Sequence, residues 1–167
     1  MCLRIFILCF SVLSLQSQTL KISEVRALYK DAAQDKSKVA SFYEMLSKVD
    51  KKDGISLNAY KGASIALKSR YAKTIKAKKE GFIEGVTILE AIITEHPNTV
   101  EPRFIRLTIQ QNSPKLLKYK SNITEDKSFL LKQYLKIKSK SLQFIIKDYI
   151  LNANTFSEEE KALILKS

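Results

Sequence analysis

Cysteine and histidine, on which many catalytic and metal sites depend, are almost absent from this sequence. It holds two cysteines, Cys2 and Cys9, both near the N-terminus, and a single histidine, His96. A catalytic triad or a zinc site needs several such side chains held together, so both are nearly excluded. The sequence also has no glycine-rich phosphate loop, nucleophile elbow or zinc-binding histidine pair. We therefore expect neither enzyme activity nor a metal or cofactor.

Glycine and proline are scarce as well, with four and three residues in a chain of 167. A many-stranded sheet needs such residues at its chain reversals, and these are too few to supply them. Apolar residues instead recur at helical spacing, and no stretch alternates convincingly with a period of two. The sequence predicts helices within 23–34, 37–49, 57–73, 80–96, 100–112, 122–137, 142–154 and 157–166. We therefore expect an all-α fold of about seven to eight helices, with antiparallel hairpins stacked in a tetratricopeptide-like, solenoid or bundle arrangement.

The N-terminal segment is treated separately because it has the layout of a secretory signal peptide. A positive charge in "MCLR" precedes the apolar run "IFILCFSVLSL", which is too short to span a bilayer. The alternative is a buried N-terminal helix. We expect residues 1–18 to be a signal peptide and residues 19–167 a single all-helical domain without a transmembrane span. Such a chain would be exported to the periplasm or cell envelope, or secreted, and would keep neither cysteine.

The formal net charge of +12 suggests anionic partners. Envelope polymers and lipid headgroups are candidates, whereas an exported protein rarely meets nucleic acid, which is not expected as a partner. The densest basic run is "KSRYAKTIKAKK", residues 68–79. It is either a solvated helix end or a polyanion site at which Tyr71 stacks. Arg70 and Tyr71 are therefore candidate binding residues.

The lone histidine lies in a segment that reads as a corner between two helices. Pro97 disfavours helical geometry at His96 and so ends the preceding helix. Thr99 is placed to cap the next helix, and Glu101 and Pro102 suit its first turn. A role for His96 as a metal ligand or general base has little support, because the sequence offers no second histidine and no carboxylate pair nearby. The corner accounts for every residue of the segment.

The helix after this corner carries an unusual polar stripe. At about 100° per residue, Arg103, Arg106 and Gln110 share one arc, with apolar residues on both sides. Both flanks could pack against neighbours and leave the stripe solvated in a groove. The two guanidinium groups could instead hold a carboxylate, a phosphate or a partner's acidic side chain. A third account pairs them internally with Asp126 or Glu101.

Residues 57–107 resemble a degenerate tetratricopeptide repeat. Counting back from Pro97, the small position of the repeat falls on Gly85 and its large apolar position on Leu89, but its next small position falls on Ile92. The segment "YKGA", residues 60–63, is similar to the aromatic-x-small start of a first repeat helix. We include its Tyr60 among the candidate binding residues. Glycines inside these helices indicate close helix approach, because glycine in a helix costs about 1 kcal/mol relative to alanine.

The segment "RFIRLTIQQNSPKLLKYKSNITEDK", residues 103–127, resembles small exported proteins of Bacteroidetes, particularly of flavobacteria. Those proteins carry a similar Arg-Phe-x-Arg helix, a Gln-x-Asn-x-Pro segment, a Leu-x-Tyr and an Ile-x-Glu-Asp-Lys helix start. The resemblance implies export and a helical fold more than an activity. The matching positions are Arg103, Arg106, Gln110, Pro114, Tyr119 and Asp126.

These observations favour a non-enzymatic interaction or scaffold module that binds another envelope protein. The alternative is a binder of an anionic ligand or envelope polyanion. A third hypothesis is a hydrolase with a carboxylate pair, although both acidic clusters, Glu125 with Asp126 and residues 158–160, fit helix starts. Asn122 with Glu125, and Ser157 with Glu160, have the spacing of a capping box. The candidate binding residues are Arg103, Arg106, Gln110, Tyr119, Asp126, Tyr60, Arg70 and Tyr71.

Overall fold

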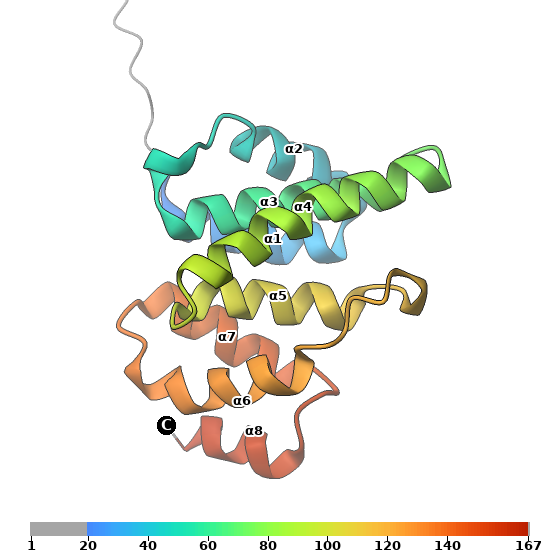
Figure 1. Cartoon of the computed structure of the whole chain (residues 1–167). Helices are drawn as coiled ribbons and strands as arrows, with labels where there is room; N and C mark the ends of the chain where they lie inside the picture. The colour runs from blue at the N-terminus through green and yellow to red at the C-terminus, as the bar shows by residue number, and fades with distance from the viewer. Residues whose placement is uncertain (1–19, 167) are drawn as a thin grey trace, which may run out of the picture.

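The structure is a computed structural model that describes residues 20–166, and within that range every regular element is a helix. The predicted all-α fold is confirmed (Figure 1). The predicted signal peptide lies outside the described residues. No helix in the described range has the length and apolar character needed to cross a membrane. The α-helices are α1 (Ile22–Gln34), α2 (Lys36–Leu46), α3 (Ile55–Ser69), α4 (Ile75–Glu95), α5 (Val100–Asn112), α6 (Ile123–Gln133), α7 (Lys140–Asn152) and α8 (Glu158–Leu165).

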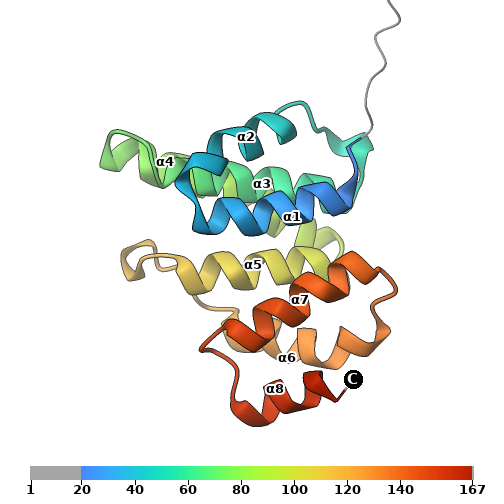
Figure 2. The ribbon, with the colours of Figure 1, turned by 180° about the vertical axis from the view of Figure 1, so that it is seen from behind.

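The helices form two groups with α5 between them (Figures 1 and 2). Helices α1 to α4 make one end of the molecule, and α6 to α8 make the other. Helix α5 packs on α3 and α4 on one side and on α6 on the other, while α7 returns to contact α1. Three short 3₁₀ helices complete the described part: η1 (Lys51–Asp53), η2 (Lys115–Leu117) and η3 (Tyr134–Lys136). A tetratricopeptide-like stacking of the pairs stays a prediction.

Helices α3 and α4 form the closest pair, and glycines make this approach feasible. A Cβ atom added to Gly85 would lie 2.4 Å from the carbonyl oxygen of Gly62 and 2.5 Å from the backbone nitrogen of Ala66. A Cβ on Gly62 would lie 2.7 Å from the carbonyl oxygen of Gly85. The two backbones touch where neither residue has a side chain. The sequence prediction of close helix approach at these glycines is confirmed.

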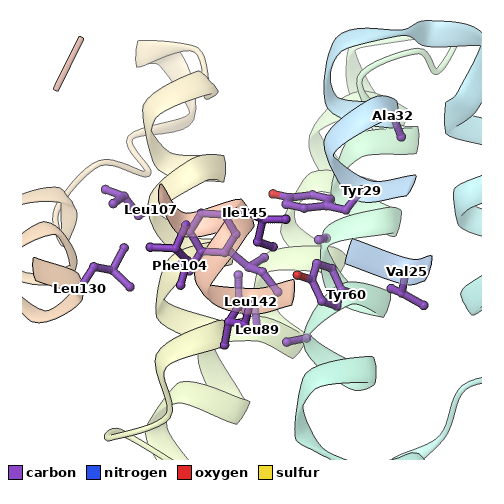
Figure 3. Close-up of a cluster of buried hydrophobic side chains, with 14 of the residues drawn as sticks. Val25, Tyr29, Ala32, Tyr60, Leu89, Phe104, Leu107, Leu130, Leu142 and Ile145 are labelled. Atoms are coloured by element: carbon purple, nitrogen blue, oxygen red, sulfur yellow. The ribbon is translucent and has the colours of Figure 1, made fainter. Parts of the chain in front are cut away.

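One hydrophobic cluster draws residues from all eight α-helices. Figure 3 shows Phe104 of α5 in its middle, with Leu130 of α6 on one side and Tyr29 and Tyr60 on the other. The rings of Tyr29 and Tyr60 meet edge to face, with their centroids 5.3 Å apart. Fully burying an apolar side chain contributes about 1.5–3 kcal/mol. This shared core accounts for the contact between the two helix groups.

The beginning of α4 differs from the prediction. The helix starts at Ile75, whereas the sequence indicated a start near residue 80. Thr74 caps it, and the Thr74 hydroxyl accepts a hydrogen bond of 3.1 Å from the backbone nitrogen of Ala77. The basic run 68–79 therefore covers the end of α3, the turn and the first turns of α4. Residues 73–80 are all exposed.

The predicted caps of three other helices have different outcomes. The capping box of α8 is confirmed: Glu160 donates its backbone N–H to the Ser157 hydroxyl, and Ser157 donates its own to the Glu160 carboxylate. Asn122 and Thr99 hold the N-cap positions of α6 and α5 but make no side-chain cap bond, so that prediction is wrong. The Asn122 side-chain oxygen instead accepts a hydrogen bond from Gln110.

Candidate functional site

The corner at His96 has the predicted geometry. Helix α4 ends at Glu95 and α5 begins at Val100. The backbone N–H of His96 donates to the carbonyl of Ile92 at 2.9 Å, and its carbonyl accepts from Thr99 at 3.1 Å. The His96 side chain is exposed. The corner positions the arginines of α5, and the site is built from them.

A buried ion pair joins α5 to α6. Arg106 donates from Nε to Asp126 Oδ2 at 2.7 Å and from Nη2 to Asp126 Oδ1 at 2.8 Å, a two-pronged contact that matches the carboxylate plane. A third bond of 2.8 Å runs from Arg106 Nη1 to Glu90 of α4. Asp126 is wholly buried and Arg106 is 4% exposed. Burial alone would lower the pKa of Arg106, but the two carboxylates outweigh burial and raise it.

Arg103 closes the solvent side of this pair. Its Nη1 lies 3.1 Å from Asp126 and 2.6 Å from Glu125, and its Nε donates to the carbonyl of Pro97 at 2.7 Å. Its guanidinium carbon lies 4.5 Å from the ring centroid of Phe129, a cation–π distance. The hydrogen bond from Arg103 lowers the pKa of Glu125. Arg103 therefore has a backbone, a carboxylate and an aromatic partner.

Tyr119 and Gln110 complete this cluster, which we call the α5–α6 network. The Tyr119 hydroxyl donates to Glu90 at 2.5 Å, and both burial and that carboxylate raise the pKa of Tyr119. Gln110 is wholly buried, and its amide donates to Asn122 at 3.2 Å. The five residues predicted along 103–126 thus gather in one region. The structure shows the internal pairing of both arginines with Asp126 instead of an open groove.

Glu101, the other internal partner considered, binds Arg26 of α1 instead of either arginine of α5. The two bonds, from Nε to Oε1 and from Nη2 to Oε2, are both 2.7 Å. Arg26 also donates to Ser139 at 3.0 Å and to Ser141 at 2.7 Å, and Ser56 donates to Glu101 at 2.7 Å. These five residues form the Arg26 network, which joins α1, α3, α5 and the start of α7.

The sequence interpretation missed the Arg26 network. Arg26 lies at the edge of the apolar face of α1, beside Val25 and Tyr29, where a charged residue indicates a buried partner. Tyr60, predicted to be a binding residue, is wholly buried beside this network and belongs to the core instead of a binding surface. Its pKa is raised first by burial and then by the charge of Glu101.

Two open clefts are also present, and the larger one borders the Arg26 network at Arg26 and Ser141. The larger, the α1/α7 cleft, has a volume of about 700 Å³, and Ala27, Lys30, Tyr134 and Phe144 are among its lining residues. Phe144 is 67% exposed. Lys30 forms an ion pair of 2.9 Å with Asp148. An exposed phenylalanine beside a cleft is a candidate contact for a partner molecule.

The smaller cleft, the α2/α4 cleft, has a volume of about 460 Å³ and lies between α2, the end of α3 and the start of α4. Tyr43, Lys68 and the predicted binding residue Tyr71 line it. Arg70, also predicted, is exposed, with its guanidinium carbon 6.0 Å from the ring centroid of Tyr71. Of the predicted binding residues, Tyr71 is both exposed and part of the lining of this cleft, whereas Arg70 is exposed beside it.

The residues in 20–166 offer no group of three or more histidine, cysteine, aspartate or glutamate side chains that could hold a metal ion. No protein-family model matches the chain, and neither does any curated protein or solved structure. The geometry of the clefts and networks is therefore the ground for a functional proposal.

Proposed function

We propose that this chain is a non-enzymatic, exported helical protein that binds another protein of the periplasm or cell envelope. The carrying observation is Phe144, which is 67% exposed beside the α1/α7 cleft. Aromatic side chains that fill pockets dominate the binding energy of many protein interfaces. Tyr134 and Ala27 extend the apolar lining of this cleft, and lysines surround it, as in an interface with an apolar centre and a polar rim.

The two buried networks support this proposal over binding of an anion by the arginine stripe. Arg103 and Arg106 already hold the carboxylates of Asp126, Glu125 and Glu90 at 2.6–3.1 Å. An incoming phosphate would have to displace these carboxylates and leave Asp126 buried without a partner, which is costly. The alternative function, binding of an envelope polyanion or of lipid headgroups, therefore draws support from exposed basic residues such as Arg70 and Lys68 and not from the arginine stripe. The export of the chain is supported by its N-terminal segment and by its resemblance to exported proteins.

Site-specific photocrosslinking in the cells that encode the chain tests the proposal. A photoreactive phenylalanine analogue replaces Phe144, and a matched variant carries it at Lys51, an exposed residue of η1 away from the cleft. We expect a discrete adduct with one envelope protein from position 144 and none from position 51. Equal labelling from both positions, or no protein adduct from position 144, would contradict the proposal. Washing with concentrated salt distinguishes the proposed function from the alternative, because the binding of a polyanion weakens as the ionic strength rises.

A further inference from the structure

The α2/α4 cleft holds cations that have no carboxylate partner. The Lys68 ammonium lies 3.3 Å from the ring centroid of Tyr43, and the Lys36 ammonium lies 5.3 Å from that of Tyr71. Within residues 20–166, neither lysine forms an ion pair or a side-chain hydrogen bond, in contrast to Arg103. The tyrosine rings hold the lysine side chains in place, and the positive charge stays available to an incoming group.

The lining of the same cleft is also apolar. Val39, Ile65 and Ala72 contribute to it together with the tyrosine rings, and Glu84 is the acidic residue of the lining. A phosphate polymer would meet the charges but would bury little against these aliphatic side chains. The cleft therefore fits a protein segment that combines carboxylates with large apolar side chains.

Helix α8 of this chain presents such a surface. Glu158 and Glu159 lie on its outward side together with Leu163 and Leu165, which are 66% and 61% exposed. At about 100° per residue these four positions share one half of the helix circumference, while Ile164 points into the core. The carboxylate of Glu158 contacts Lys161 at 2.9 Å but its side chain remains 85% exposed. Within residues 20–166, helix α8 thus presents an acidic, leucine-bearing face that stays exposed.

The two surfaces lie at opposite ends of the molecule. In both views α2 and the start of α4 belong to the group at one end, and α8 lies at the other (Figures 1 and 2). Helix α8 therefore does not reach the α2/α4 cleft of its own chain. We propose that the chain assembles head to tail, with α8 of one copy docked in the α2/α4 cleft of the next. Such an interface joins two different patches, so one surface stays free at each end of the assembly.

Charge and apolar complementarity carry this proposal. The glutamates of α8 face Lys36 and Lys68, and the leucines face the aliphatic floor and the tyrosine rings. The proposal goes beyond the proposed function and uses neither Phe144 nor the α1/α7 cleft. The proposed function and the head-to-tail assembly can therefore fail independently, because photocrosslinking at position 144 and self-association are measured separately.

Analytical ultracentrifugation of the exported, purified chain tests the proposal. At about 0.15 M salt, which largely screens the repulsion between copies of net charge +12, we expect the weight-average mass to rise as the protein concentration increases from about 10 μM to about 1 mM. A chain that stays monomeric over this range overturns the proposal.

Two double variants each remove one of the surfaces. Lys36→Glu with Lys68→Glu alters the cleft, and Glu158→Gln with Glu159→Gln alters α8. We expect each to self-associate at least about tenfold more weakly than the parent chain. Mixed together they should form a one-to-one dimer and nothing larger, since each supplies the surface that the other has lost. The control, Lys51→Glu with Lys52→Glu, makes the same charge change on η1 and should associate like the parent.

The mixing result also separates a lost surface from a lost fold. A variant that fails to fold would not contribute its intact surface, and circular dichroism reports its helix content. If the folded variants associate as strongly as the parent, or if the mixture of folded variants gives no dimer, the head-to-tail interface is wrong. Binding of an acidic peptide from another protein by a chain that remains monomeric would likewise refute the proposal.

Discussion

Replacing Asp126 with asparagine should destabilise the fold more than any exposed charge change. The Asp126 side chain is wholly buried and receives two hydrogen bonds from Arg106 and one from Arg103. Asparagine keeps the size of the side chain but removes its charge. Arg106 would then remain buried with Glu90 as its single carboxylate partner. Breaking a buried ion pair by neutralising one partner costs about 3–5 kcal/mol, and because Glu90 remains we expect about 3 kcal/mol.

Equilibrium unfolding in urea measures this loss. With an m-value of about 2 kcal/mol/M, the unfolding midpoint of Asp126→Asn should fall by about 1.5 M. The matched control is Glu125→Gln at the neighbouring position. Glu125 also contacts Arg103, but its side chain is 56% exposed, and exposed pairs contribute about 0–1 kcal/mol.

Two results would refute this reasoning. If Asp126→Asn and Glu125→Gln lower the free energy of unfolding equally, burial does not set the strength of the Arg106–Asp126 pair. A loss below about 1 kcal/mol in Asp126→Asn would show that Arg106 does not depend on its buried partner. Adding Arg106→Met to Asp126→Asn provides a further check. It removes the charge left without its main partner, so part of the lost stability should return.

The remaining predictions concern helix packing and pH. Gly85→Ala should lower the free energy of unfolding by about 1–3 kcal/mol in a urea titration, because the new methyl group would meet the Gly62 carbonyl oxygen at 2.4 Å. A gain of about 1 kcal/mol, the helix preference of alanine, would mean that the two helices separate without cost. Burial raises the pKa of Tyr29 from 10.0 to about 12, against the opposing effect of its hydrogen bond to Thr108. The folded state then holds the Tyr29 proton more tightly than the unfolded state, so this stability is complete below pH 10 and is lost as the pH rises to about 12. Urea unfolding across this range should show a shallower decline in Tyr29→Phe, and identical pH profiles would contradict the assignment.

Helix positions were largely readable from the sequence because they depend on local spacing. The pattern in α1, with Val25, Tyr29 and Ala32 buried on one face, follows from the helical period alone. The start of α4 was not readable in this way. Its first turns, "IKAKKE", are exposed all round and carry no apolar period, so the boundary is set by the Thr74 cap. The sequence prediction therefore followed the apolar period that begins near residue 80 and missed the cap at Thr74.

The partners of the arginine stripe required tertiary information. The sequence showed that Arg103 and Arg106 share an arc between two apolar flanks, which indicates a helix covered on both sides. It did not decide among solvent, a ligand and an internal acid. The acid that binds both arginines lies on α6, and the partner of Glu101 lies 75 residues away on α1. Such pairing depends on how the two helix groups meet, which no local pattern specifies.

Helix α5 has a distinctive position because both networks converge on it. Glu101 in its first turn engages α1 and α3, and its partner Arg26 reaches the start of α7, while Arg106 near the middle of α5 engages α4 and α6. Buried ion pairs add little net stability over apolar packing, but a wrong pairing leaves a charge buried alone and costs several kcal/mol. Several helices of this chain have similar lengths and apolar faces, so packing alone would allow several arrangements. We infer that the two networks select one of them. Glu101 of α5 forms its ion pair with Arg26 of α1, and Arg103 and Arg106 of α5 donate to carboxylates of α4 and α6. Lys36 and Lys68, by contrast, are exposed and form no ion pair within residues 20–166, so their charges stay available to a partner.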